Sequence, residues 1–211
     1  MRVGIIGAGK IGEAAATRLV AAGHHVMISN SRGPETLADL EQSLGQDATA
    51  GTVVDATRFG EVVLVAIPLR AIDTLPADEL RGKIVIDANN YYPQRDGQIA
   101  ELDHGEIGSS ELLAHRLPGA RVVKAFNTIL YRRLMHEGRP SGAADRLAIP
   151  LVGDDAQAKG VVARLIDDMG FDPIDAGTLA DGRNQEPGTP VYNNPTGAEG
   201  VREALGLERA S

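Results

Sequence analysis

Three glycines near the N-terminus have the spacing of a phosphate-binding turn. Gly7, Gly9 and Gly12 form the pattern G-x-G-x-x-G between the apolar residues 2–6 and the helix-like residues 10–22. In a strand-to-helix turn, the first glycine permits a tight bend, the second lets the backbone approach a pyrophosphate, and the third allows close packing. The positive end of the helix then stabilises the phosphate charge. In this context the pattern predicts a dinucleotide site.

The end of the next expected strand lacks the acid that is common in NAD-binding proteins. Such proteins often present a carboxylate there to the ribose 2′-hydroxyl, whereas this chain has Asn30, Ser31 and Arg32. An amide, a hydroxyl and a guanidinium all donate hydrogen bonds to phosphate oxygens, and arginine binds phosphate in a fork. We therefore expect the three residues to bind the 2′-phosphate of NADP.

Three further segments fall where a ligand of an open α/β sheet binds, at the carboxyl ends of the strands. They are "AIP" at residues 66–68, "ANNYYP" at residues 88–93 and "AFNT" at residues 125–128. Their small residues admit a cofactor, and Asn89, Asn90, Asn127 and Thr128 offer neutral hydrogen-bonding groups. Five of the seven aromatic residues lie in or near these segments or in the tail: Tyr91, Tyr92, Phe126, Tyr131 and Tyr192. Such a wall is suited to a planar ring substrate stacked beside nicotinamide.

The elements that must position these residues alternate between strands and helices. Apolar runs predict strands at residues 2–6, 25–29, 61–68, 82–90, 120–127, 147–155 and 171–177. Helical patterns cover residues 10–22, 34–44, 109–116, 154–170 and 198–205, with Gly170 as the expected C-cap of the fourth. The alternation predicts a Rossmann-type α/β fold with a doubly wound, mostly parallel sheet of about seven or eight strands.

Composition excludes several classes of function. The chain has 211 residues, 43% of them hydrophobic, and a net charge of −8, which disfavours general attraction to nucleic acid or an anionic membrane. It has no cysteine and no defensible histidine pattern for a metal, so we expect no metal site and no thiolate chemistry. There is no long apolar segment and no signal-peptide pattern, so we expect a cytoplasmic protein.

The composition changes after residue 178. Residues 179–211 are polar and rich in glycine and proline, and only residues 198–205 have a credible helical pattern. We interpret residues 1–178 as an NADP-binding domain and residues 179–211 as a C-terminal extension, which either wraps over the domain or a neighbouring subunit or is disordered.

Taken together, these motifs resemble a known family. "MRVGIIGAGKIG", "SNSRGPETL", "AIPLRAID", "VVKAFNT", "PLVGDDAQAK" and "PIDAGTL", in this order, are similar to the NADPH-dependent reductases of the deazaflavin coenzyme F-420 and to the cytoplasmic domains of STEAP-type ferric reductases. The likeness covers about residues 1–180. It implies a homodimer that binds NADP(H) and reduces a small molecule.

The resemblance also implies roles for particular residues. NADP would lie along Gly7, Ala8, Gly9, Lys10, Ile11 and Gly12, and Ser31 and Arg32, with Asn30 beside them, would hold the 2′-phosphate. Ile67, Pro68, Asn89, Ala125 and Phe126 would border the cofactor. Asn127 and Thr128 would lie near the nicotinamide and its ring partner, and we name them as the catalytic candidates.

The sequence leaves the acceptor open. We expect hydride transfer between NADP(H) and a planar ring, first the deazaflavin F-420 and second FMN or FAD, because no acid–base residue pattern is present and the cofactor and acceptor carry the chemistry. One alternative is reduction of a small imine or carbonyl compound, which in related enzymes needs an added helical domain. The other is a non-catalytic NADP-sensing subunit of a redox complex.

Overall fold

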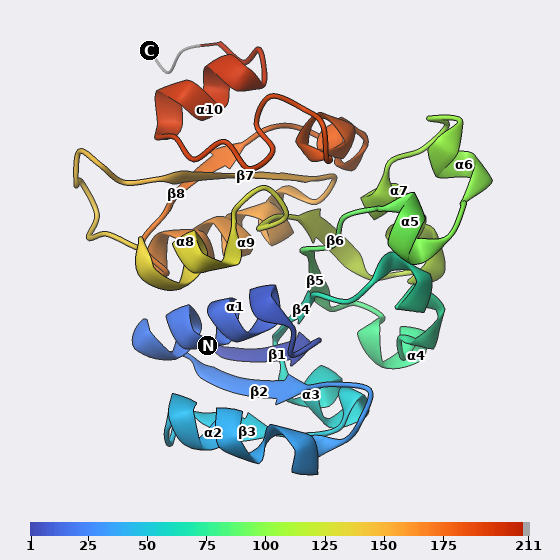
Figure 1. The fold of residues 1–211 in the computed structure, drawn as a ribbon, viewed down its shortest axis with the longest axis vertical. Coiled ribbons are helices and arrows are strands. Elements are labelled where there is room, and N and C mark those ends of the chain that lie inside the picture. The colour runs from blue at the N-terminus through green and yellow to red at the C-terminus, as the bar shows by residue number, and fades with distance from the viewer. Residues whose placement is uncertain (209–211) are drawn as a thin grey trace.

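A twisted sheet of eight strands forms the centre of this computed structural model, which describes residues 1–208 (Figure 1). The strands lie in the order β3-β2-β1-β4-β5-β6-β7-β8. Their bounds are β1 (Arg2–Ile6), β2 (His25–Ser29), β3 (Ala48–Ala50), β4 (Val62–Val65), β5 (Ile84–Asp87), β6 (Arg121–Lys124), β7 (Ala148–Gly153) and β8 (Asp172–Asp175). The strands from β1 to β6 pair in parallel, whereas β7 pairs antiparallel with β6. The predicted doubly wound, mostly parallel α/β fold is confirmed.

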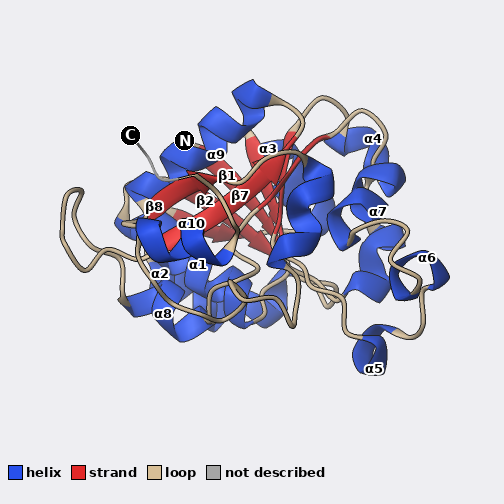
Figure 2. Ribbon diagram, turned by 90° about the horizontal axis from the view of Figure 1, so that it is seen from above, coloured by secondary structure: helices blue, strands red, loops and turns tan. Residues whose placement is uncertain are grey.

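Helices cover both faces of this sheet (Figure 2). The α-helices are α1 (Lys10–Ala21), α2 (Ala38–Leu44), α3 (Val53–Phe59), α4 (Ala77–Leu80), α5 (Pro93–Asp96), α6 (Ala100–Asp103), α7 (Ser109–Arg116), α8 (Tyr131–His136), α9 (Ala156–Asp168) and α10 (Ala198–Ala204). Three 3₁₀-helices accompany them: η1 (Pro34–Leu37), η2 (Leu69–Thr74) and η3 (Leu179–Gln185). None of the helices described between residues 1 and 208 combines the length and apolar composition that crossing a membrane requires.

The continuous apolar runs of the central strands follow from burial on both faces. In β4, Val62 and Leu64 pack into the hydrophobic cluster that contains residues of α1, α8 and α9, while Val63 and Val65 pack into the cluster that contains residues of η2, α4 and α7. Successive side chains of a strand point to opposite faces, so both registers of β4 must be apolar. The two clusters hold the sheet rigidly below the carboxyl ends of its parallel strands.

Several elements differ from the sequence prediction. The strand β3 and the helices α3 and α8 were not predicted, and the expected helix at residues 34–44 is divided into η1 and α2. The helix α3 has a local signal, because the Thr52 hydroxyl accepts the Asp55 N–H at 3.1 Å and the Asp55 carboxylate accepts the Thr52 N–H at 3.1 Å. The strand β3 has only three residues, too few to show a period. At the end of α9, Met169 is the C-cap and Gly170, with φ +94°, follows it.

The C-terminal segment lies on the part of the sheet that runs in the reverse direction. In Figure 1, α10 lies beside β7 and β8, and Val191 and Val201 form a small apolar cluster with Ile174 of β8. The structure describes this part of the chain through Glu208; the last three residues of the expected extension lie outside the described part. The 3₁₀-helix η3 packs on β6 and β7, and Asn193 after it bonds to the Thr128 carbonyl in the loop after β6, beside the site described below.

Arg146 is the buried charged residue that joins β8 to the end of α9. Its guanidinium donates to the Asp172 carboxylate and to the Asp167 carbonyl, both at 2.7 Å. We expect Arg146→Met to lower the free energy of unfolding by about 1.5–3 kcal/mol, the range for hydrogen bonds to charged groups. Urea unfolding measures this change. Arg164→Met, on the exposed face of α9, is the control and should change it by less than about 0.5 kcal/mol; equal losses in the two variants would contradict the assignment.

Candidate active site

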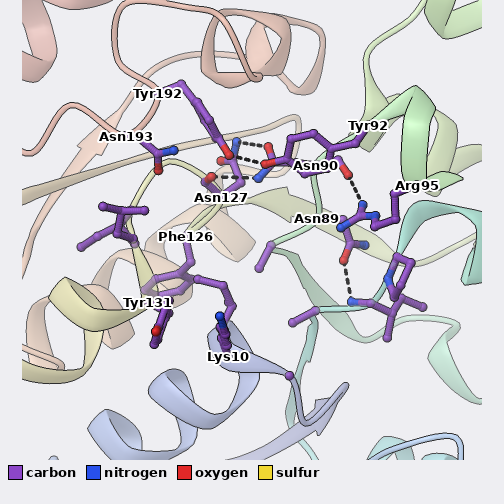
Figure 3. Close-up of a pocket in the computed structure, with 18 residues that line it drawn as sticks. Lys10, Asn89, Asn90, Tyr92, Arg95, Phe126, Asn127, Tyr131, Tyr192 and Asn193 are labelled. Atoms are coloured by element: carbon purple, nitrogen blue, oxygen red, sulfur yellow. Dashed lines mark hydrogen bonds between the residues drawn. The ribbon is translucent and has the colours of Figure 1, made fainter.

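The loops that follow β1, β4, β5 and β6 meet at one edge of the sheet and enclose a cavity of about 420 Å³ (Figure 3). Eight of the predicted site residues line it: Gly9, Lys10, Ile11, Ile67, Pro68, Asn89, Phe126 and Asn127. Convergence follows from the topology, because the carboxyl ends of parallel strands share an edge. The C-terminal segment adds Tyr192 and Asn193, which Figure 3 shows across the cavity from Lys10 and Tyr131.

The three glycines of the first turn have three different surroundings. Gly7 has φ +110°, and a Cβ there would lie 2.2 Å from the Ala66 carbonyl oxygen. A Cβ at Gly12 would lie 1.8 Å from the Gly7 carbonyl oxygen, so α1 packs directly on the turn. A Cβ at Gly9 would meet no atom within 4 Å, and Gly9 lines the cavity, so its backbone is open to a ligand. This combination is what a pyrophosphate against the start of α1 requires.

The N-terminus of α1 has further features that suit an anion. Gly9 is the N-cap and supplies no capping side chain, so the first N–H groups of the helix have no side-chain acceptor from that residue. The Lys10 ammonium lies 5.0 Å from the centre of the Tyr131 ring and adds positive charge beside the turn. Ala8 is half-buried in the turn itself.

The loop after β2 is shaped by Asn30. The Asn30 side-chain oxygen accepts the N–H groups of Arg32 and Gly33 at 2.8 and 3.0 Å, and its amide donates to the Thr36 hydroxyl at 2.8 Å. The Asn30 side chain, whose amide was expected to bind phosphate, thus orders the loop instead. Ser31 and Arg32 are exposed at the tip of this loop, one strand away from the cavity.

The ends of β4 and β5 are joined through Asn89. Its side-chain oxygen accepts the Ile67 N–H at 2.8 Å, and its own N–H donates to the Asp87 carboxylate at 3.0 Å. Asn89 is 3% exposed. Its side chain therefore fixes the cavity wall formed by Ile67 and Pro68.

A buried polar cluster that was not predicted from the sequence lies directly behind this wall. The Lys124 ammonium, fully buried at the end of β6, donates to the hydroxyls of Ser109 and Ser110 at 2.8 and 3.0 Å. The Ser110 hydroxyl donates to the buried Asp87 carboxylate at 2.5 Å. Burial raises the pKa of the Asp87 carboxyl, while the Lys124 charge and the two hydrogen bonds act in the opposite direction. The signal in the sequence is a charged residue at the end of each of two apolar strands.

The same cluster holds the C-terminal segment. The Glu186 carboxylate accepts both the N–H and the hydroxyl of Ser109 at 2.7 Å, and it lies 3.9 Å from the Lys124 ammonium. Two chain segments that are more than 70 residues apart are thereby fixed at one point.

The loop after β6 contains the two catalytic candidates in different surroundings. Phe126, with φ +65° and 1% exposure, turns the chain sharply, and Ala125 before it is fully buried. The Asn127 amide donates to the Asn90 side-chain oxygen at 3.1 Å and to the Gln185 carbonyl at 2.7 Å. Thr128 does not line the cavity; its carbonyl accepts the Asn193 N–H at 2.9 Å. Both residues join loops together in this structure.

Four of the five expected aromatic residues line the cavity. They are Tyr92, Phe126, Tyr131 and Tyr192. The Tyr91 hydroxyl instead donates to the Asp103 carboxylate at 2.7 Å and accepts the Ile99 N–H at 3.0 Å, outside the cavity. Tyr91 therefore stabilises the loop between α5 and α6.

The charges around the cavity have one sign. Among the described residues that line it, the charged side chains are those of Lys10 and Arg95, and neither aspartate nor glutamate lines it. The Arg95 guanidinium lies 4.8 Å from the centre of the Tyr92 ring and pairs with Asp96, whose carboxylate is buried behind the wall. Such a lining favours a neutral or negatively charged ligand over a cation.

Comparison with known proteins identifies similar chains. A family model described as "NADP oxidoreductase coenzyme F420-dependent" matches residues 2–91. The metalloreductase STEAP3 of Rattus norvegicus is 34% identical over 208 residues, which are 98% of this chain and 40% of that protein. This chain thus spans about two fifths of the length of that curated relative.

Two solved structures cover almost the whole chain. A hypothetical protein from Sinorhizobium meliloti is 35% identical with a TM-score of 0.77, over 92% of this chain and 94% of that one. A putative F420-dependent NADP reductase from Arthrobacter sp. FB24 is 25% identical with a TM-score of 0.76, over the full length of both chains.

The ionic interaction between buried Lys124 and Asp87 predicts how variants of these two residues change the free energy of unfolding. Lys124→Met leaves the Asp87 carboxylate buried without its cation, and we expect a loss of about 3–5 kcal/mol in the free energy of unfolding. Adding Asp87→Asn removes the second charge while an amide at this position still hydrogen-bonds to Ser110, so the double variant should be more stable than Lys124→Met alone. Urea unfolding of the two variants and of Asp87→Asn measures the coupling. Strictly additive losses would show that the two charges do not interact.

Proposed function

We propose that this chain, whose residues 2–91 match the family model of coenzyme F420-dependent NADP oxidoreductases, transfers hydride between NADP(H) and a planar ring acceptor, the deazaflavin F-420 first and FMN or FAD second. The observation that carries the proposal is the cavity that joins the open Gly9 turn to a wall of aromatic side chains. A nicotinamide and a second ring stacked in one cavity would be held in the proximity that hydride transfer requires.

The cofactor half of the proposal assigns NADP(H) to the carboxyl ends of β1 and β2. The pyrophosphate would lie along residues 7–12, and Ser31 and Arg32 would bind the 2′-phosphate from the loop that Asn30 orders. Ile67, Pro68, Asn89, Ala125 and Phe126 would form or support the nicotinamide end. Exposed Arg32 and the absence of a carboxylate from residues 30–32 support NADP over NAD.

The acceptor half rests on the chemistry of the lining. Bound NADPH would supply a hydride from its nicotinamide ring to an atom of the acceptor ring. A neutral acceptor ring thereby gains one negative charge until water supplies a proton. Lys10 would stabilise that charge, while the charge of Arg95 is largely compensated by its ion pair with Asp96; no carboxylate among the described lining residues opposes Lys10. A cationic imine substrate would instead be repelled by the positively charged lining.

The remaining assignments stay predictions within this proposal. Asn127 and Thr128 would act as positioning residues of the acceptor side rather than as proton donors, given their bonds to Gln185 and Asn193. Residues 1–178 would bind NADP, with residues 179–211 as an extension that completes the site. The working form would be a cytoplasmic homodimer without nucleic-acid or membrane partners.

Turnover tests the function directly. We expect the purified chain to oxidise NADPH, followed by its nicotinamide absorbance, when oxidised F-420 is added, and more slowly with FMN or FAD. NADH should be a poorer donor. Tight NADPH binding without oxidation by any of the three acceptors would contradict the proposal and favour a non-catalytic NADP-sensing subunit.

The 2′-phosphate assignment is tested by binding alone. Arg32→Ala should weaken NADP(H) binding by about 1.5–3 kcal/mol, because one charge-assisted contact is lost, and should leave NAD(H) binding nearly unchanged. Isothermal titration of both cofactors measures the difference. Arg164→Ala, on the exposed face of α9 away from the cavity, is the matched control. Equal losses for NADP(H) and NAD(H) in Arg32→Ala would show that this residue does not bind the 2′-phosphate.

A further inference from the structure

We propose that Tyr92 and Tyr192 act as one hydrogen-bonding unit that selects the acceptor, a planar ring whose edge carries carbonyl oxygens or ring nitrogens. The inference rests on the proposed function and adds to it the residues that determine acceptor specificity. Both tyrosines line the cavity, and their hydroxyls are hydrogen-bonded to each other (Figure 3). They are 100 residues apart in the chain, one after β5 and the other in the C-terminal segment.

Hydrogen-bond accounting leaves one donor free for a ligand. Two phenol hydroxyls carry two protons, and their mutual bond uses only one of them. Burial and the bond to Tyr192 raise the pKa of Tyr92 to about 12, so this hydroxyl stays protonated at neutral pH. The pair therefore presents one O–H to the cavity. A hydroxyl whose oxygen already accepts a hydrogen bond is also the stronger donor.

The C-terminal segment that carries Tyr192 makes two hydrogen bonds to the loop after β6. The Gln185 carbonyl accepts the Asn127 amide at 2.7 Å, and the Asn193 N–H donates to the Thr128 carbonyl at 2.9 Å. Between these points, the Glu186 carboxylate is bound to Ser109. Residues 185–193 are thus fixed at both ends, and the Tyr192 hydroxyl reaches Tyr92 from this segment.

The other side of the pair is held just as closely. The Tyr92 N–H donates to the Asp96 carboxylate at 3.1 Å, and the Arg95 guanidinium stacks on the Tyr92 ring while it binds Asp96. The Arg95 guanidinium also donates to the Asn90 carbonyl at 2.7 Å. Two phenols that are held by different segments of the chain are therefore hydrogen-bonded to each other at the cavity.

This arrangement matches the charge that develops in the proposed reaction. When a neutral ring accepts hydride, negative charge spreads to the carbonyl oxygens and nitrogens at its edge. An O–H donor already in place stabilises that charge without having to reorient. Rings without such an edge, and substrates that carry positive charge, gain nothing from the pair.

The test measures acceptor binding and separates it from cofactor binding. Oxidised FMN and oxidised F-420 are titrated, by the change in their fluorescence, against the full chain saturated with NADP⁺. We expect the double variant Tyr92→Phe/Tyr192→Phe to raise the Kd for the ring by about threefold to tenfold, the effect of a lost hydrogen bond. The two single variants should show losses that do not add up to that of the double variant, because the hydroxyls act together. The Kd for NADP⁺ should stay within about twofold in all three variants.

Tyr91→Phe is the matched control, since it removes a neighbouring hydroxyl that lies outside the cavity. Unchanged ring Kd values in the double variant, strictly additive single losses, or an equal loss in Tyr91→Phe would each overturn the inference while leaving the proposed function intact. The proposed function fails separately, and the inference with it, if the unmodified chain binds NADP⁺ but neither ring.

Discussion

The arrangement of the site depends on the buried ammonium of Lys124. It lies at the end of β6, where one charge without hydrogen-bond partners would destabilise the fold by several kcal/mol, so its neighbours must supply oxygen atoms. Asp87 is reached through Ser110, and Glu186 is reached through Ser109. From Asp87 the bonds continue to Asn89 and the wall after β4, and from Glu186 they fix the C-terminal segment. The hydrogen bonds that surround the Lys124 charge thus fix both the wall after β4 and the C-terminal segment of the cavity.

This organisation explains why the first half of the site could be predicted from the sequence. Glycine spacing depends on local geometry: Gly7 needs a positive φ, Gly12 needs close packing, and Gly9 must be open, and all three requirements act within residues 7–12. The strand ends follow from parallel topology, so Ile67, Asn89 and Phe126 could be placed on one edge without coordinates. The short elements β3 and α8 were missed because neither is long enough to show a hydrophobic period.

The second half of the site depends on contacts between distant segments, which no local pattern reports. Asn127 lines the cavity, and only the fold shows that its amide joins Asn90 to Gln185. Tyr192 was one of several aromatic residues in the sequence, and only the fold shows that it meets Tyr92. The tail had a composition compatible with disorder, yet buried polar bonds and the cluster around Ile174 hold its described residues on the sheet. Polar composition predicts disorder poorly where a few buried partners are available.

The charged side chains that line the cavity favour an acceptor that becomes more negative during the reaction. Two cations, a pair of phenol hydroxyls and no carboxylate among the described lining residues make a site that tolerates a ring gaining electrons. In the proposed reaction, the protein would contribute orientation and electrostatics, and the hydride would move directly from one ring to the other.

Transfer of deuterium from labelled NADPH tests whether hydride moves directly between the two rings. The chain is supplied with NADPH that carries deuterium at one or the other C4 position, together with oxidised F-420, and the reduced deazaflavin is examined by mass spectrometry. Direct transfer predicts that deuterium from one of the two stereoisomers is retained on the acceptor ring carbon, in ordinary water. Reduced acceptor that carries only solvent hydrogen from both stereoisomers would contradict direct transfer between two rings held in this cavity.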